Sequence, residues 1–164
     1  MSIKSHPKGL YVLFFTEAWE RFSYYGMRAL LVLYLVKHLN MARHNALEIY
    51  ALYTGLVYFT PMIGGYLADK YLGARKAIII GGLVMALGHL AMAFESLLYP
   101  ALGLLIVGNG FFKPNISTIV GGLYEEHDPR RDGGFTIFYM GINLGAFFSR
   151  LVCGTLGENY GWDW

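Results

Sequence analysis

The chain has 164 residues, of which 55% are hydrophobic and only 15% are charged, and its formal net charge is +2. A soluble domain of this length has too small an interior for so many apolar residues, so the composition argues against a soluble protein. The small net charge, with basic residues spread between apolar runs, gives no sign of a nucleic-acid partner. The single cysteine, Cys153, excludes a disulfide within the chain.

Five apolar runs follow one another, and each is long enough for a membrane-spanning helix, which needs about 20 apolar residues. Short charged or turn-rich segments separate the runs. The sequence therefore predicts an all-α, polytopic membrane protein in which residues 1–164 form one transmembrane bundle. The predicted spans cover about residues 10–39, 47–68, 77–94, 100–123 and 135–156.

Lysine and arginine are divided unevenly between the two sets of loops. Seven fall on the side of the N-terminus and two on the other side, and short loops rich in these residues stay in the cytoplasm. We therefore expect a multi-pass protein of the cell membrane with a cytoplasmic N-terminus. The seven are Lys4, Lys8, Lys70, Arg75, Lys76, Arg130 and Arg131, and the two are Lys37 and Arg43.

Residues 17–28, inside the first run, include four charged residues, which is unusual for a membrane span. At about 100° per residue they fall with one tyrosine on a single helix face, in a stripe about 16 Å long. The stripe comprises Glu17, Glu20, Arg21, Tyr24 and Arg28, with Tyr25 at its border. Intramembrane charge is costly, so this face must line a polar cavity or another helix. A structural alternative is that the intrahelical pair Glu17 and Arg21, four residues apart, serves only helix packing.

Lys113 stands midway in the fourth run, and no acid is near it in sequence. With the stripe, the spans then hold two glutamates against three basic residues, leaving Arg150 out, which is a net charge of +1. A surplus cation in a cavity favours an anion. That anion is either a substrate carboxylate or an acid on another part of the protein.

Two further ionisable residues lie within the runs. His89 is alone in the third run, where a histidine is more often a packing residue than a proton relay. Arg150 lies about 22 Å into the fifth run, at roughly 1.5 Å per residue, and has no partner that the sequence indicates.

The pairing of glutamates with arginine in a cavity favours proton coupling. Desolvation stabilises the neutral acid and a nearby guanidinium stabilises the carboxylate, so exchanging partners as the cavity opens changes the protonation state. This is the physics of a proton-coupled carrier.

Three motifs resemble signatures of one family. Residues 17–26 resemble the ExxERFxYYG motif of the proton-dependent oligopeptide transporter family, a branch of the major facilitator superfamily. Residues 64–76 resemble that family's loop between spans two and three, and residues 138–145 resemble its FYxxINxG signature in span five. The motifs stand in order on the expected spans, and the resemblance covers nearly the whole chain.

The resemblance implies a symporter of di- and tripeptides driven by protons, of which this chain is the N-terminal part, lacking the C-terminal half. It implies proton coupling by Glu17, Glu20, Arg21 and Lys113. It implies peptide binding by Arg21, Tyr24, Tyr25, Arg28, Tyr58, Lys113 and Asn143, with Arg28 and Lys113 holding the substrate carboxylate. In the loop motif, it implies a gating contact that involves Asp69 and Arg75.

Other classes of function have less support. No metal-ligand spacing and no nucleophile–base arrangement is present in the sequence, so neither an enzyme nor a metal or cofactor is expected. Two alternatives stay open: a non-transporting membrane packing or assembly module, and a carrier of another small anion such as nitrate. The two glutamates kept together with Arg21 and Lys113 favour the peptide carrier.

Overall fold

The computed structural model describes residues 6–160, and this part of the chain is almost entirely helical and contains no strand. The long helices are α1 (Lys8–Leu33), α2 (Arg43–Leu67), α3 (Ala74–Met92), α4 (Leu98–Gly122) and α5 (Arg131–Tyr160). Short helical segments of other pitch adjoin them: η1 (Tyr34–His38), η2 (Ala68–Leu72) and η3 (Glu95–Leu97). The predicted all-α class is confirmed.

The helices coincide with the five apolar runs, and their ends, with the adjoining short segments, lie within five residues of the predicted limits. Among residues 6–160, four helical segments are long and apolar enough to cross a membrane, namely 43–72, 74–92, 95–122 and 131–156. The first helix is not among them, because its charged residues lower its hydropathy. Helices suit a bilayer because each backbone polar group is bonded within its own segment.

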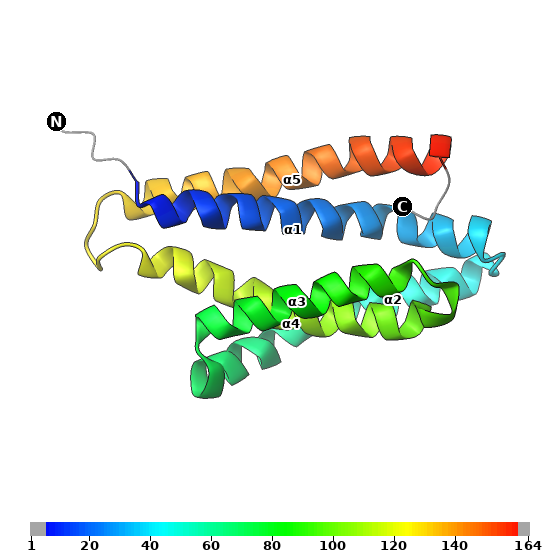
Figure 1. The fold of residues 1–164 in the computed structure, drawn as a ribbon, viewed down its shortest axis with the longest axis horizontal. Coiled ribbons are helices and arrows are strands. Elements are labelled where there is room, and N and C mark those ends of the chain that lie inside the picture. The colour runs from blue at the N-terminus through cyan, green and yellow to red at the C-terminus, as the bar shows by residue number, and fades with distance from the viewer. Residues whose placement is uncertain (1–5, 161–164) are drawn as a thin grey trace.

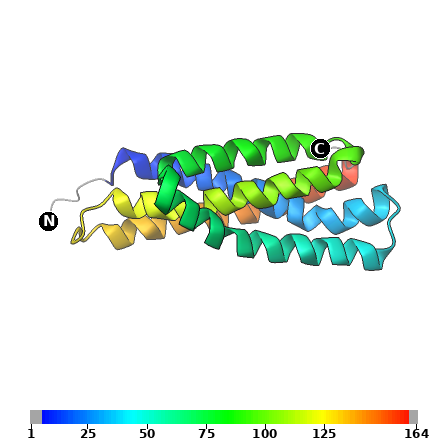
Figure 2. The same ribbon diagram turned by 90° about the horizontal axis from the view of Figure 1, so that it is seen from below.

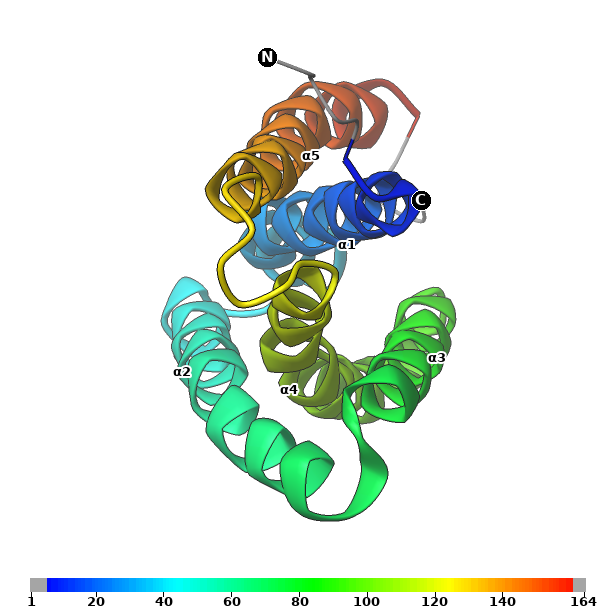
Figure 3. The same ribbon diagram turned by 90° about the vertical axis from the view of Figure 1, so that its left-hand side faces the viewer.

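The helices form two groups that lie against each other. Figure 1 shows α5 alongside α1, and Figure 3 shows α4 between α2 and α3 on the other side of α1. Seen from below in Figure 2, the helices run along the same long axis. This arrangement places α1, which carries the charged stripe, against α4, which carries Lys113, at the centre of the bundle.

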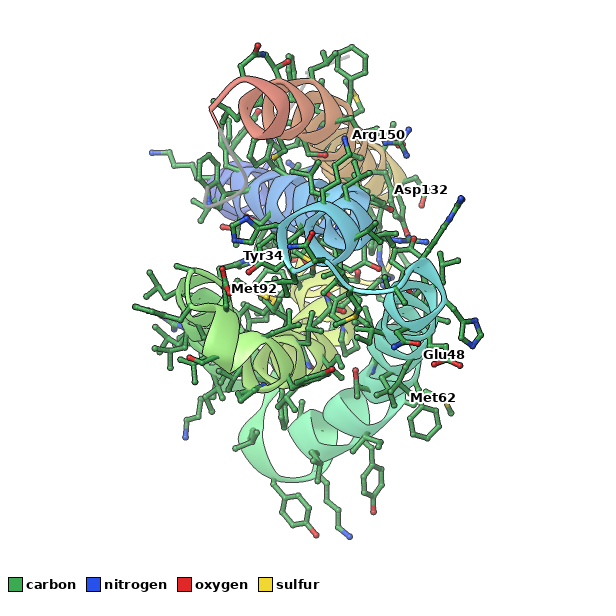
Figure 4. All side chains as sticks on the ribbon, turned by 90° about the vertical axis from the view of Figure 1, so that its right-hand side faces the viewer. Tyr34, Glu48, Met62, Met92, Asp132 and Arg150 are labelled. Carbon is green, nitrogen blue, oxygen red and sulfur yellow. The ribbon has the colours of Figure 1, made fainter. Side chains whose placement is uncertain are left out.

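The outer surface of the bundle is apolar, as expected where helices meet lipid or other helices. Phe15, Met62, Leu83 and Phe147 are among the large apolar side chains that lie mostly exposed. Glu48, near the start of α2, and Met62 both point away from the bundle (Figure 4).

The connections between helices fall at two opposite ends of the bundle. The start of α1 and the connections α2–α3 and α4–α5 lie at one end, and the connections α1–α2 and α3–α4 lie at the other (Figure 1). The end where α1 starts therefore carries six of the seven basic residues predicted for it, and the seventh, Lys4, lies outside the described residues. Lys37 and Arg43 lie at the α1–α2 connection, at the other end. At the end where α1 starts, a hydrogen bond joins the segment before α1 to the α4–α5 connection, because His6 Nδ1 lies 2.8 Å from the hydroxyl oxygen of Tyr124.

Two glycines have distinct structural roles. Gly73 has φ 77°, in the left-handed region that favours glycine, and it separates η2 from α3. Gly108 on α4 lies so close to α3 that an added Cβ would stand 2.7 Å from the carbonyl oxygen of Gly81. Small residues at such positions let membrane helices pack backbone to backbone.

We expect Gly108→Ala to lower the unfolding temperature of the intact protein in detergent, because overpacking costs typically about 1–3 kcal/mol. Gly103→Ala is the matched control, since a Cβ at this α4 position meets nothing within 4 Å. Alanine also favours the helix, so the control should melt at or above the temperature of the unsubstituted protein. Equal melting temperatures for the two variants would contradict close α3–α4 packing at Gly108.

Candidate functional site

The centre of the site is a buried charged cluster on α1, formed by Glu17, Glu20 and Arg21. Arg21 Nε lies 2.9 Å from Glu17 Oε1 and 2.5 Å from Glu20 Oε2. The three residues are between 3% and 8% exposed. Glu17 and Arg21 are four residues apart and share a helix face, and the long Arg21 side chain also reaches Glu20, its neighbour in the chain. The charged stripe predicted for α1 thus lies inside the bundle at this level.

A fourth buried residue joins the charged cluster from another helix. Asn109 on α4 is 2% exposed, and its Nδ2 donates a hydrogen bond to Glu20 Oε1 at 3.0 Å. The sequence interpretation did not select Asn109 as a site residue. The sequence could have indicated it, because a polar amide side chain between Gly108 and Gly110 in an apolar run has no hydrogen-bonding partner nearby in the sequence.

Arg28 lies two turns after the charged cluster and has a different partner. Its Nε donates a hydrogen bond to the hydroxyl oxygen of Tyr50 at 2.8 Å, and its Cζ lies 5.7 Å from the centre of that ring. Tyr50 is on α2, so this contact joins α1 to α2. The sequence interpretation missed Tyr50 as well, because nothing in the local pattern distinguishes it from other tyrosines of the span.

Lys113 lies one turn beyond Asn109 on α4 and is partly buried. Its Nζ stands 5.0 Å above the ring of Tyr58, a side chain that is 56% exposed. The Lys113 charge acts on Glu17 and Glu20, but it forms no ion pair with either carboxylate. The cation is therefore close to the charged cluster, and its contact among residues 6–160 is with an aromatic ring rather than with a carboxylate.

The two tyrosines of the first motif lie beside the charged cluster. Tyr24 is 6% exposed, and its ring centre lies 5.4 Å from Arg21 Cζ. Tyr25 meets Tyr24 edge to face, with 5.2 Å between the ring centres. These rings separate the charged cluster from Arg28 along the same helix.

Other predicted residues are not brought to this cluster. Asn143 on α5 is exposed, and its Nδ2 donates to the Tyr139 carbonyl oxygen of its own helix. Asp69 and Arg75 are both exposed, and they do not pair with each other in the described part of the chain. Their functional roles stay predictions. Arg150 is exposed on α5 (Figure 4).

The arrangement is suited to moving charge rather than to holding a metal. Among residues 6–160, no group of three or more histidine, cysteine, aspartate or glutamate side chains could hold a metal ion. The charged cluster instead has two carboxylates sharing one guanidinium, with the further cation of Lys113 nearby. Inside a bundle such charges interact strongly, because the effective dielectric constant is far below that of water.

In comparisons with known proteins, the chain matches one family and its relatives. A model of the POT family matches residues 75–164. The di-/tripeptide transporter of Lactococcus lactis is 48% identical to the chain over 162 residues, covering 93% of the chain and 33% of that relative. The dipeptide and tripeptide permease A of Proteus mirabilis is 44% identical over 161 residues, covering 96% of the chain and 33% of that relative.

A solved structure agrees with these sequence matches. The crystal structure of peptide transporter POT in complex with sulfate superimposes with a TM-score of 0.94 at 48% sequence identity. The match covers 99% of this chain and 35% of that one. The chain therefore spans about a third of the length of its relatives, and nearly all of it takes part in the match.

Proposed function

This chain belongs to the POT family, as its motifs predicted, and on that premise we propose that it acts as the N-terminal part of a carrier importing di- and tripeptides together with protons. The fold is the helical bundle of the peptide transporters it matches, which are multi-pass membrane proteins of the major facilitator fold. Since the chain spans 33% of the curated relatives, transport is proposed for the carrier that contains it.

The observation that carries the proposal is the buried carboxylate pair around Arg21, with a second cation close by. Glu17 and Glu20 share the Arg21 guanidinium, and Lys113 Nζ stands over the ring of Tyr58 with no carboxylate partner in the described part of the chain. We infer that Glu20 takes up the transported proton, because its neutral form no longer needs Arg21. When Glu20 is neutral, its ion pair with Arg21 is lost, and a contact of the charged cluster with Lys113 or with the substrate can replace it.

The peptide is proposed to bind through its invariant groups. Arg28 and Lys113 hold the terminal carboxylate by charge-assisted hydrogen bonds, which are stronger than neutral ones. The hydroxyls of Tyr24, Tyr25 and Tyr58 and the amide of Asn143 bind its backbone. Recognition of termini and amides gives affinity for peptides with variable side chains.

Orientation and gating complete the proposal. We infer that the end carrying the N-terminus faces the cytoplasm, because most of the loop lysines and arginines lie there. Asp69 and Arg75 stand at the α2–α3 connection of that end, and a contact between them in one state of the carrier would close it.

The substrate class is tested by competition in liposomes that contain the full-length carrier. Uptake of labelled dialanine should be inhibited by unlabelled di- and tripeptides but not by nitrate. A dipeptide with an amidated C-terminus should compete about tenfold or more weakly, because it lacks the charge that Arg28 and Lys113 hold. Inhibition by nitrate with none by tripeptides would contradict the proposal and favour a carrier of small anions.

Tyr50→Phe tests how Arg28 is positioned. Removing the hydroxyl deletes the 2.8 Å hydrogen bond to Arg28 Nε, so KM for dialanine should rise by about threefold to tenfold with little change in kcat. Tyr99→Phe is the control, since this tyrosine is 65% exposed at the start of α4. An unchanged KM in Tyr50→Phe would show that the bond does not orient Arg28 for the peptide.

A further inference from the structure

A cavity of about 230 Å³ lies beside the charged cluster, lined mainly by α1, α3 and α4, with one residue of α2, Tyr53. Its polar lining comes from Glu20, Ser23, Asn109 and His89, with the tyrosines Tyr24 and Tyr53. Three of the proposed peptide-binding groups, Arg28, Tyr58 and Lys113, do not line it. Tyr24 is the proposed peptide-binding group that does line it. Four lining residues come from α3 and one from α2, so the cavity reaches Glu20 mainly from the α3 side of α4, and α2 lies on the opposite side (Figure 3).

Apart from Glu20 Oε2, which is ion-paired with Arg21, two buried polar atoms of the cavity lining have no hydrogen-bond partner in the described part of the chain. They are the hydroxyl oxygen of Tyr24 and Oδ1 of Asn109, on residues that are 6% and 2% exposed. Buried polar groups are normally satisfied by protein or by ordered water. The cavity has room for several waters at about 30 Å³ each, and its polar atoms supply the partners that such waters need.

His89 gives the cavity an ionisable group near one end of the bundle. It lies three residues before Met92, the last residue of α3, which is about 5 Å along the helix axis. The α3 residues Gly82, Met85, Ala86 and His89 share one helix face and line the cavity over about 10 Å. In the orientation proposed above, the His89 end faces the outside.

We propose that this cavity is a water-filled route by which protons from the outer solution reach Glu20, with His89 as its outermost ionisable group. The proposal rests on the proposed proton-coupled function. The His89 imidazole accepts a proton, waters pass a proton on, and the Glu20 carboxylate receives it, so no other bond changes. A separate route lets Glu20 be protonated while a peptide occupies the groups on the other side.

The charges around the route are consistent with this direction of transfer. Glu20 faces Glu17 and Arg21 on its own helix, Lys113 on α4 and Tyr53 on α2. His89 shares the cavity with Glu20, Tyr24 and Tyr53 as its other ionisable lining groups, and none of these is a cation. A proton on His89 is therefore drawn towards the carboxylate rather than repelled within the cavity.

The route is tested with two variants of the full-length carrier in liposomes. His89→Gln removes the ionisable group, and Ala86→Phe fills the cavity from an exposed lining position. Leu87→Phe is the control, because Leu87 is 58% exposed and does not line the cavity. Each variant is assayed for dialanine accumulation driven by a proton gradient, and for dialanine counterflow, an exchange that needs no net proton movement.

We expect both cavity variants to lose accumulation by about tenfold or more, the size of effect that a positioned proton-transfer group has, and to retain counterflow. The control should match the unsubstituted carrier in both assays. Accumulation that persists in both cavity variants would overturn the route, and so would loss of counterflow in both, since the lining would then serve the peptide or the fold. A failure of the unsubstituted carrier to accumulate dialanine would overturn the proposed function itself.

Discussion

Glu20→Gln is expected to reduce proton-driven accumulation of dialanine by the full-length carrier to the level of empty liposomes, while counterflow of the same peptide continues. Glutamine keeps the shape of the side chain and a carbonyl oxygen that can accept the hydrogen bond from Asn109 Nδ2. It cannot take up or release a proton. The substitution therefore removes the ionisable group with little change in packing.

The same substitution leaves Arg21 with one carboxylate partner. Glu17 Oε1 still lies 2.9 Å from Arg21 Nε, so the buried guanidinium is not left unpaired. This matters because an uncompensated buried charge typically costs about 3–5 kcal/mol and would unfold many proteins. Removing Glu17 and Glu20 together should accordingly lower the amount of protein in the membrane, whereas Glu20→Gln alone should not.

The control for this experiment is Glu48→Gln. Glu48 points away from the bundle near the start of α2 (Figure 4), and its partner is the exposed His44 at 3.1 Å. Such an exposed pair contributes little, so accumulation should be unchanged. If Glu20→Gln accumulated dialanine as well as Glu48→Gln did, Glu20 would not be the coupling group.

Lys113→Ala is expected to weaken dialanine binding by about tenfold to a hundredfold, with normal abundance of the carrier in the membrane. A hydrogen bond to a charged group is worth about 1.5–3 kcal/mol, which corresponds to this loss of affinity. The measurement is the concentration dependence of dialanine counterflow together with the amount of carrier recovered from membranes. Lys76→Ala, an exposed lysine at the α2–α3 end, is the control.

The expected effect follows from the contacts of Lys113. Its Nζ is held by the ring of Tyr58 at 5.0 Å and has no ion-pair partner among residues 6–160, so removing the charge leaves no carboxylate newly unpaired. A role in the fold would give the opposite pattern. Lost membrane abundance, with unchanged affinity in the carrier that remains, would favour a packing module over a carrier.

The helices and the burial of the charged stripe could be predicted from the sequence because both depend on local periodicity. Apolar runs of bilayer length set the helix limits, and the spacing of Glu17, Glu20 and Arg21 sets their common face. The hydrogen-bond partners of Asn109 and Tyr50 could not be predicted in this way. Their contacts join helices far apart in sequence, and no local pattern states which helix face meets which neighbour.

The cavity beside the charged cluster illustrates the same limit. His89 was interpreted as a packing residue because its own helix offers it no ionisable partner. The structure brings α3 against α4 and next to α1, so that His89 and Glu20 line one cavity although 69 positions separate them in the chain. Asn143 and Asp69 are exposed in this bundle and do not contact the charged cluster, so their roles stay predictions.

Proton movement coupled to peptide entry is the most direct test of this account. Liposomes containing the full-length carrier and a pH-sensitive dye are given an inward gradient of dialanine, with equal pH on both sides and the membrane potential clamped. The account predicts that the interior acidifies only when dialanine is present, and that Glu20→Gln abolishes the acidification. Dialanine entry without any change of internal pH would contradict the proton-coupled mechanism.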